Sequence, residues 1–384
     1  MSRADEVGGE LEKSLVSITF TSDRVSEFSI LCSYNMYLKI YVLEPSSLLS
    51  LALSNDTVIN INKYKNRLTM QTITLGQNGS TVTALGIGAW AWGDKLFWNY
   101  GSDYGVSQVQ EAFEATLDSG ISFFDTAEVY GMGESESLLG RFMKELGRPA
   151  QIATKYFPLP WRFTAQAVSD ALTESLKRLQ VERVELYQVH MPFSFFMSQE
   201  TLMNALADEV KRGRIATVGV SNYSADQMRE AHNYLAARGV PLAVNQVRYS
   251  LLARKIESNG ILDTARQLGV TILAYSPLAQ GLLTGKYTPE KYVEPTGARR
   301  IDPGFSKSGL EKIAPVVKLL HQIGEKRDRT PAQVALNWLI AQGVIPIPGA
   351  KTAHQATQNA GALGWSLSKE EFAQLEQVTR PWLS

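Results

Sequence analysis

The sequence of 384 residues contains a single cysteine, Cys32, so no intramolecular disulfide bond can form. Chains without disulfides are typical of reducing compartments. An excess of charge of one sign is also missing, because 38 lysine and arginine residues balance 38 aspartate and glutamate residues. Without a net basic charge the chain has no field that would gather nucleic acid. A small-molecule ligand is therefore favoured over a polyanion.

Long apolar runs are absent as well, so we expect no contact with a membrane. Lys39 and Glu44 interrupt the most apolar stretch, residues 28–53, whereas a membrane-spanning helix needs roughly 18 apolar residues. Asp5 and Glu6 argue against a cleaved targeting segment. We expect a cytoplasmic protein, with the plastid stroma as the alternative if the N-terminus is a transit segment. The 4 histidines form no H-x-x-x-H pair, and no metal site is predicted.

The first part of the chain differs from the rest in its pattern. Residues 1–66 lack the regular alternation that follows, and we interpret them as an N-terminal extension that is poorly ordered or not part of the native product. Residues 67–384 are expected to form the catalytic domain, opening with a small hairpin near residues 71–76.

Short apolar runs then alternate with amphipathic segments. The runs are Leu85–Gly88, Ser122–Asp125, Ile152–Lys155, Val184–His190, Thr217–Ser221, Ala243–Gln246, Thr271–Tyr275 and Ile345–Pro348. The helical patterns between them include Val106–Ser119, Ala165–Leu179, Leu202–Arg212, Ala225–Ala237 and Gly260–Leu268. This alternation predicts a (β/α)8 TIM barrel. The alternative is a doubly wound sheet, which usually carries a G-x-G-x-x-G turn that is missing here.

Polar side chains end almost every predicted strand, where a barrel of this type carries its active site. They are Asp125, Lys155, His190, Ser221, Asn222, Gln246 and Tyr275, and Tyr130 follows in the loop after Asp125. Buried charges are costly unless they are paired. We therefore expect Asp125 to hold the ammonium of Lys155, and His190 to orient a substrate carbonyl.

Tyr130 is the candidate proton donor. Tyrosine ionises near pH 10, and a neighbouring lysine cation is expected to lower the pKa of the phenol toward its working range. Each residue alone has a structural interpretation: a loop tyrosine, a solvated strand-end lysine, a core histidine, or a helix-capping aspartate. The prediction depends on all four recurring at strand ends or in the loops that follow them.

These residues resemble a known family. The segment from Asp125 to Gly131, DTAEVYG, followed by Glu134-Ser135 and Leu138-Leu139-Gly140, is similar to the aldo-keto reductase signature D-T-A-x-x-Y-G…E…L-G. Ile152–Lys155 and Leu186–His190 look like the strands that carry the family's lysine and histidine. Gly213-Arg214-Ile215, Gly219–Tyr223, Asn245-Gln246, Tyr275–Leu278 and Ile347–Lys351 continue the resemblance in order.

The resemblance implies NADPH-dependent reduction of an aldehyde or ketone, with Asp125, Tyr130, Lys155 and His190 as the catalytic residues. It also implies that Ser221, Asn222 and Gln246 hold the nicotinamide carboxamide and that Tyr275 stacks on the ring. The remaining cofactor contacts that it implies are Ser276, Leu278, Gln280, Gly281, Gly349, Lys351, Thr352, Gln355, Gln358 and Asn359.

Lys351 and Thr352 would meet the 2′-phosphate of NADPH, since an ammonium and a hydroxyl near a helix start suit an anion. One departure stands beside them. Many relatives carry an arginine a few residues later, but this chain has none between Ala353 and Asn359. Loss of a bidentate cation is expected to weaken discrimination for the phosphate. Gln355 is the neutral substitute that we expect there.

The substrate side is expected to be aromatic. Trp90, Trp92, Trp98, Tyr100, Phe157 and Trp161 fall in segments near the predicted barrel mouth, and such a pocket suits flat or apolar carbonyl compounds. Within the family the sequence resembles the plant-plastid and cyanobacterial reductases that include pyridoxal reductase, which makes pyridoxal a candidate. Two alternatives stay open: an NADP-sensing regulatory subunit resembling potassium-channel β subunits, and a barrel enzyme that uses Lys155 as a Schiff base.

Overall fold

The computed structural model describes residues 26–32, 36–42, 50–53, 57–60, 71–290, 292–295 and 297–384. The chain divides into two compact units, Met1–Lys65 and Asn66–Ser384. The first unit contains two antiparallel hairpins, β1 (Ser26–Cys32) with β2 (Met36–Val42) and β3 (Ser50–Leu53) with β4 (Thr57–Asn60). The remainder of that unit lies outside the described residues. That residues 1–66 are poorly ordered or non-native stays a prediction.

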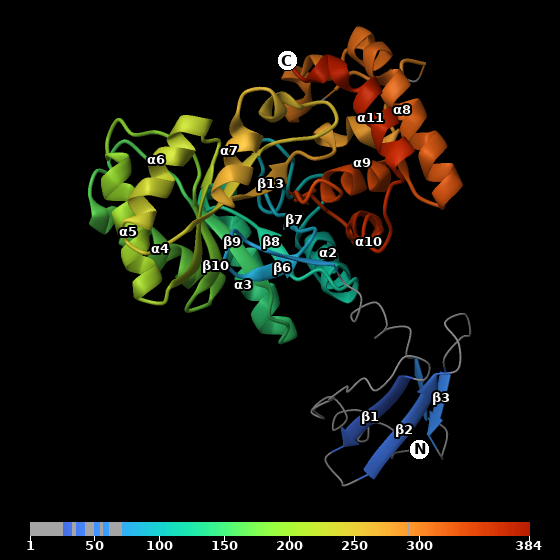
Figure 1. Ribbon diagram of the computed structural model, residues 1–384, viewed down its shortest axis with the longest axis horizontal. Helices are drawn as coiled ribbons and strands as arrows, with labels where there is room; N and C mark the ends of the chain where they lie inside the picture. The colour runs from blue at the N-terminus through green and yellow to red at the C-terminus, as the bar shows by residue number, and fades with distance from the viewer. Residues whose placement is uncertain are drawn as a thin grey trace. The chain divides into compact units, whose positions relative to one another are not determined.

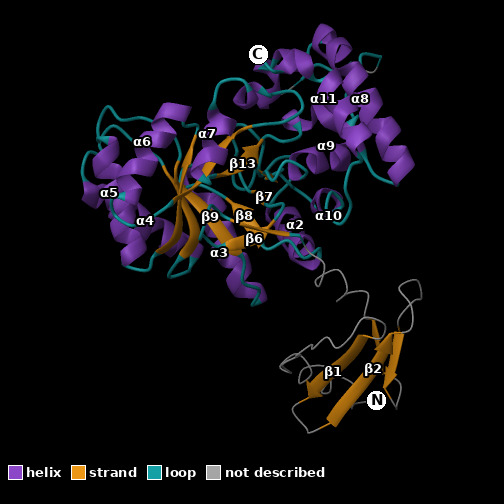
Figure 2. Cartoon of the chain, viewed as in Figure 1, coloured by secondary structure: helices purple, strands orange, loops and turns teal. Residues whose placement is uncertain are grey.

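The second unit is built on a parallel sheet of 8 strands in the order β14-β13-β12-β11-β10-β9-β8-β7. The strands are β7 (Ile87–Gly88), β8 (Phe123–Asp125), β9 (Gln151–Tyr156), β10 (Val184–Val189), β11 (Ile215–Ser221), β12 (Leu242–Arg248), β13 (Thr271–Tyr275) and β14 (Ile345–Pro346). Backbone bonds from Gly86 N to Pro346 O (3.1 Å) and from Gly88 N to Pro348 O (3.0 Å) join the first strand to the last segment. The predicted (β/α)8 barrel is confirmed (Figure 2).

Helices surround this sheet (Figure 1). They are α2 (Val106–Asp118), α3 (Glu134–Leu146), α4 (Ala165–Leu179), α5 (Gln199–Lys211), α6 (Ala225–Ala236), α7 (Ile261–Leu268), α8 (Lys307–Arg327), α9 (Pro331–Ile340), α10 (Ala353–Ala360) and α11 (Lys369–Val378). Neighbours along the chain from α3 to α7 contact one another, and α10 contacts α2. In the part of the chain that the structure describes, no helix is long and apolar enough to cross a membrane.

The helix boundaries follow local chemistry. Thr330 caps α9, its hydroxyl accepting from the backbone of Gln333, and Pro331 occupies the first turn, where its missing N–H costs nothing. Helix α7 stops at Gly269, whose φ of +67° suits glycine. These signals explain why the predicted helices agree with the observed ones to within a few residues.

A cluster of apolar side chains fills the barrel interior at the end where the strands begin. The small hairpin expected near residues 71–76 is present as β5 (Thr72–Thr74) with β6 (Thr81–Thr83), and it closes the end where the strands begin. Its Leu75 and Val82 join the barrel interior in one buried cluster with Phe123, Ala153, Leu186, Ala243, Val244, Leu273, Ile345 and Ile347. Side chains alternate between the two faces of a strand. The next inward positions after Phe123, Ala153 and Val244 are therefore Asp125, Lys155 and Gln246, which lie next to this apolar cluster on the side of the strand ends.

Candidate active site

Lys155 lies at the centre of the candidate site, with its side chain fully buried. Its Nζ donates to Asp125 Oδ1 at 2.5 Å and to the backbone oxygen of Thr126 at 2.8 Å. The hydroxyl of Tyr130 is 3.5 Å from the same nitrogen. Burial lowers the pKa of Lys155, and the neighbouring Asp125 carboxylate opposes that shift. The predicted pairing of Asp125 with Lys155 is thus present, and Tyr130 joins it.

Two amides hold the other oxygen of Asp125. Gln246 Nε2 donates to Asp125 Oδ2 at 2.7 Å, and Gln188 Nε2 donates to the same oxygen at 3.1 Å. Gln246, whose contact with the nicotinamide stays a prediction, is 2% exposed, and its amide is oriented by the carboxylate. Gln188 was missed by the sequence analysis. The signal was available, because Gln188 lies two positions before His190 and therefore shares its inward face.

His190 is an uncharged neighbour of Tyr130. The two rings are 5.6 Å apart, edge to face, and Phe157 packs on the other side of the histidine at 5.4 Å. Burial, followed by the charge of Lys155, lowers the pKa of His190 to about 3. Its Nδ1 has no hydrogen-bond partner among the described residues. A neutral imidazole keeps one ring N–H, which can donate to a carbonyl oxygen without adding charge to the site.

Tyr130 begins the short helical turn η2 (Tyr130–Gly133) that leads into α3. Left-handed conformations at Gly131, Met132 and Gly133 turn the chain back over the barrel mouth. The expectation that Lys155 lowers the pKa of Tyr130 is wrong for this structure. Burial, followed by the charge of Asp125, raises the pKa of Tyr130 well above 10. The physical reason is that burial disfavours the charged phenolate and the Asp125 carboxylate adds to this, so the phenol stays protonated.

The residues expected at the nicotinamide lie together at the ends of β11 and β13. Tyr275 donates its hydroxyl proton to Asn222 Oδ1 at 3.0 Å. Asn222, with a φ of +63°, donates its amide to the backbone oxygen of His190 at 3.2 Å. Ser221 donates to the backbone oxygen of Gln246 at 3.0 Å. Asn222 and Tyr275 are partly exposed, so both can meet a ligand next to His190.

The turn after β13 has the backbone of an anion site. Ser276, Ala279, Gln280 and Gly281 all have positive φ values, from 47° to 106°. Successive residues of this kind turn backbone N–H groups toward one side, which makes a concave surface for phosphate. Leu278 lies within the turn, and Oε1 of Gln280 is buried without a partner among the described residues.

The cofactor contacts expected from Lys351 to Asn359 lie in α10 and directly before it. Thr352 caps this helix, its hydroxyl accepting from Gln355 N at 3.3 Å. Gln355 Oε1 accepts from the backbone N–H of Lys351 at 2.7 Å, so the predicted neutral substitute is engaged in shaping the loop. Asn359 donates to the backbone oxygen of Gly349 at 3.3 Å. Gln358 accepts from Gln333 through its backbone oxygen at 2.9 Å.

Lys351 lies against aromatic rings from the first loop. Its Nζ is 4.7 Å from the ring centre of Trp98 and 4.3 Å from that of Tyr104. Burial, followed by the charge of Arg299, lowers the pKa of Lys351 to about 8.

Arg299, in the turn η5 (Gly297–Ile301), was not predicted from the sequence. Its guanidinium lies 5.7 Å from the Trp98 ring and its Nε donates to the Gln280 backbone oxygen at 3.1 Å. The segment after Lys351 contains no arginine, and the arginine near Lys351 comes from another loop. Sequence distance hid it, because the two cations are brought together only by the fold.

The aromatic residues divide into two groups. The ring centre of Trp90 lies 6.1 Å from that of Tyr130 and, edge to face, 5.5 Å from that of Trp98. Phe157 packs against His190, so these rings line the mouth. Trp161 is 67% exposed on the loop after β9. The prediction that Trp92 belongs to the pocket is wrong. Trp92 is fully buried outside the barrel, where it packs on Phe124 and Phe142 and its indole N–H donates to the Ala350 backbone oxygen at 2.8 Å.

The prediction that Tyr100 lies in the substrate pocket is also wrong. It is 8% exposed and packs edge to face on Tyr104 in the main core cluster, so it supports the first loop from the core side.

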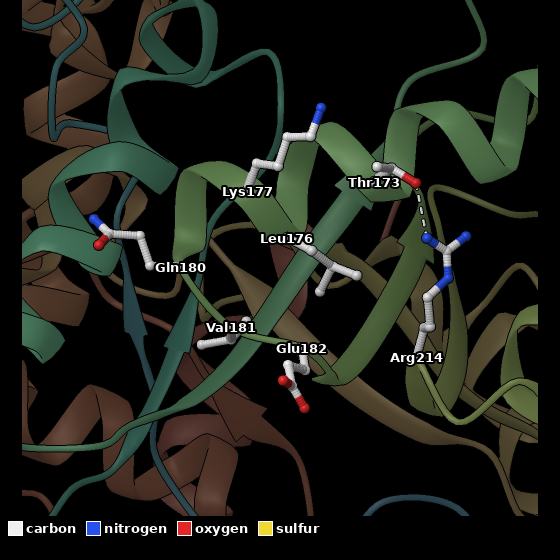
Figure 3. A pocket seen from close by; sticks show the side chains of 7 residues that line it. All are labelled: Thr173, Leu176, Lys177, Gln180, Val181, Glu182 and Arg214. Carbon is white, nitrogen blue, oxygen red and sulfur yellow. Dashed lines mark hydrogen bonds between the residues drawn. The ribbon is translucent and has the colours of Figure 1, made fainter.

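A surface hollow of about 360 Å³ lies far from the candidate active site. It lies at the opposite end of the barrel, beside the end of α4 and the starts of β10 and β11 (Figure 3). Arg214 in its wall is already bonded to Thr173 at 2.7 Å.

Comparison with known proteins agrees with this geometry. A family model described as "Aldo/keto reductase family" matches residues 84–380. Pyridoxal reductase, chloroplastic, from Arabidopsis thaliana is 39% identical over 312 residues, which cover 78% of this chain and 84% of the relative. Aldo-keto reductase str7 of Strobilurus tenacellus is 38% identical over 287 residues, covering 72% of this chain and 83% of the relative.

Solved structures show the same fold. The glycerol dehydrogenase AKR11B4 from Gluconobacter oxydans superposes with a TM-score of 0.70 at 29% identity, covering 81% of this chain and 96% of that one. An aldo/keto reductase from Klebsiella pneumoniae, solved in complex with NADP and acetate, gives a TM-score of 0.63 at 29% identity, with coverage of 81% and 96%.

Proposed function

The chain belongs to the aldo/keto reductase family and is an NADP-dependent oxidoreductase that reduces carbonyl compounds, and we propose that Tyr130 is the proton donor of that reaction. The observation that carries the proposal is the position of the Tyr130 hydroxyl, 3.5 Å from Lys155 Nζ and next to a neutral His190. Both neighbours can donate a hydrogen bond to a carbonyl oxygen at the same place.

The protonation states support reduction. The raised pKa of Tyr130 keeps the phenol protonated at neutral pH, so the proton is available when the carbonyl oxygen becomes an alkoxide. Lys155 stabilises the phenolate that remains, and Asp125 keeps Lys155 in place. His190 orients the carbonyl without competing for the proton, because its pKa is about 3.

NADPH, when bound, supplies the hydride. The residues present fit this cofactor. Trp98 Nε1 is a buried donor without a partner among the described residues, and the cations Lys351 and Arg299 lie 4.7 and 5.7 Å from the centre of its ring. We propose that these three side chains, with Thr352, receive the 2′-phosphate, and that the turn from Ser276 to Gly281 receives the pyrophosphate. Asn222 and Tyr275 would hold the nicotinamide beside His190.

The substrate is proposed to be an aldehyde or ketone with a flat or apolar body. One row of rings leads outward from Tyr130 through Trp90 to Phe97, with centres 6.1 and 5.9 Å apart. A second row leads from His190 through Phe157 to Phe193, at 5.4 and 6.3 Å. Pyridoxal, an aromatic aldehyde, is the first candidate, because the Arabidopsis relative is named as its reductase.

Two alternatives are disfavoured. The relatives above are described as reductases or a dehydrogenase, which favours an enzyme over an NADP-sensing regulatory subunit. A Schiff base on Lys155 is disfavoured, because the amine already donates to Asp125 and to the Thr126 backbone. Borohydride trapping of an aldehyde on Lys155 would restore that possibility.

The test is an aldehyde panel that includes pyridoxal, followed through NADPH absorbance, with Tyr130→Phe beside the native enzyme. Loss of the general acid is expected to lower kcat by about 10²- to 10⁴-fold. Tyr234→Phe, a tyrosine on the outer helix α6, is the matched control and should keep the native rate. Native turnover by Tyr130→Phe would show that the proton comes from elsewhere.

We also propose a cytoplasmic location, with the plastid stroma as the alternative. The single cysteine supports a reducing compartment, and the Arabidopsis relative is named as chloroplastic. Imaging of the full chain with a C-terminal fluorescent fusion decides between the two.

A further inference from the structure

A second buried carboxylate lies behind the strand that carries Lys155. Glu136, on α3, is fully buried and accepts from Thr154 Oγ1 at 2.5 Å and from Arg178 Nε, on α4, at 2.7 Å. Thr154 and Lys155 are successive residues of β9, so their side chains point to opposite faces of the sheet. Glu136 therefore binds the outer face of the strand at the level where Lys155 enters the barrel.

The same carboxylate is coupled to the turn of Tyr130. Arg178, its partner, packs against Gly133 in that turn, where an added Cβ would lie 2.7 Å from Arg178 Cδ. Gly133 has a φ of +93° and directly precedes α3. On the other side of the turn, Ser135 donates to the Ala89 backbone oxygen at 2.9 Å. The position of Tyr130 thus depends on how the start of α3 is fixed.

We propose that Glu136, acting through Thr154 and Arg178, is a positioning residue that sets the separation of the Tyr130 hydroxyl from the Lys155 ammonium. The inference rests on the proton transfer proposed above. One carboxylate oxygen is bonded to the lysine strand, and the other to the arginine that packs on the tyrosine turn. Movement of Glu136 changes the relative position of the two groups, and proton transfer depends steeply on such positions.

The negative charge of Glu136 also acts on Lys155. It raises the pKa of Lys155, as the charge of Asp125 does, and so favours the ammonium. The charged and titratable groups that face Glu136 are Arg178 from α4, Lys155 from β9 and Tyr187 from β10. Only Lys155 among them touches Tyr130.

A purely structural ion pair would behave differently, and the chain offers a matched one. Glu209, at the end of α5, is 2% exposed and accepts from Arg214 and Arg212, each at 2.6 Å. Arg214 lies directly before β11, at the end of the barrel opposite the site. Loss of Glu209 removes a buried carboxylate without touching the catalytic end, which makes Glu209→Gln the control.

The experiment compares Glu136→Gln, Thr154→Val and Glu209→Gln in the full chain. Each is assayed for melting temperature, NADPH affinity by fluorescence titration, and kcat as a function of pH. For Glu136→Gln we expect kcat to fall about 10- to 100-fold, with NADPH affinity within about twofold of native. The limb of the kcat profile that reports Lys155 should move to lower pH, because the variant loses a charge that favours the ammonium.

Thr154→Val keeps the volume and the charge but removes the bond to the strand, and it should lower kcat less and leave that limb in place. If Glu136→Gln does not fold, Thr154→Val alone tests whether the bond between Glu136 and the strand affects kcat. Glu209→Gln should lower the melting temperature while kcat and its pH profile stay native. Native kcat and a native profile in both Glu136→Gln and Thr154→Val would overturn the inference. If Tyr130→Phe also kept the native rate, the proposed proton donor would fail first.

Discussion

The ammonium of Lys155 lies 2.5 Å from the carboxylate of Asp125, with 0% and 3% of the two side chains exposed. Asp125→Asn keeps the shape but leaves the ammonium without its counter-charge, which at a buried site costs about 3 to 5 kcal/mol. Burial already lowers the pKa of Lys155, and the variant removes the opposing contribution. We expect kcat to fall by about two orders of magnitude together with a large loss in the free energy of unfolding.

The pH dependence of the loss in unfolding free energy identifies its cause. A lysine whose folded pKa lies below its unfolded value binds fewer protons when folded, so stability rises with pH. The deficit of Asp125→Asn should therefore shrink in urea denaturation as the pH rises toward the unfolded-state lysine pKa of about 10.4. Asp208→Asn, at a half-exposed partner of Arg238, is the control. A deficit independent of pH would mean that Lys155 is not the group left uncompensated.

His190 predicts an acid-labile component of stability. Its folded pKa is about 3, against 6.5 for the free side chain, so below about pH 6.5 only the unfolded chain takes up this proton. Stability is then lost as pH falls from about 6.5 toward 3, by roughly 3 to 5 kcal/mol at the end of the range. His190→Gln should lack this component, whereas His354→Gln, at an exposed histidine, should keep it. Parallel curves for native protein and His190→Gln would contradict the prediction.

The preference for NADPH over NADH is expected to come from two loops, one with Lys351 and one with Arg299. Lys351→Met and Arg299→Met should each weaken NADPH binding about 10- to 100-fold, the value of a charge-assisted hydrogen bond, with little effect on NADH. Arg300→Met, at the exposed arginine next in the chain, is the matched control. The pKa of Lys351 near 8 adds a pH signature. Native affinity for NADPH should fall above about pH 8, because binding then requires proton uptake, and Lys351→Met should lose that slope.

Much of the barrel could be predicted because its signals are local. Alternating apolar runs, a Thr-Pro helix start and glycine stops are each written in a few neighbouring residues. For the same reason Asp125, Lys155 and His190 could be placed at strand ends, and Tyr130 in the following loop. The rest depends on contacts between distant segments. Arg299 and Lys351 meet across 52 positions of sequence, and no local pattern connects them.

The errors have a similar origin. Trp92 is two residues from Trp90, and composition cannot tell which ring faces the mouth and which faces Phe142. The predicted direction of the pKa shift of Tyr130 was wrong, although the pairing of Lys155 with Asp125 was expected. Burial of the phenol, followed by the charge of Asp125, decides the sign, and the depth of burial is a property of the folded chain.

The C-terminal segment offers a test of stability away from the chemistry. Arg254 is 1% exposed, donates to Glu257 and to Thr379 Oγ1 at 2.7 Å each, and pairs with Glu376. Its guanidinium lies 5.2 Å from the Trp338 ring centre. Arg254→Met keeps the apolar stem but leaves two carboxylates without their cation, so the free energy of unfolding should fall by about 3 to 5 kcal/mol. Arg229→Met, which breaks an exposed pair with Asp226, should change it by less than about 1 kcal/mol. Urea titrations of both variants give the comparison, and equal losses would mean that the buried position of Arg254 adds nothing to the attachment of α11.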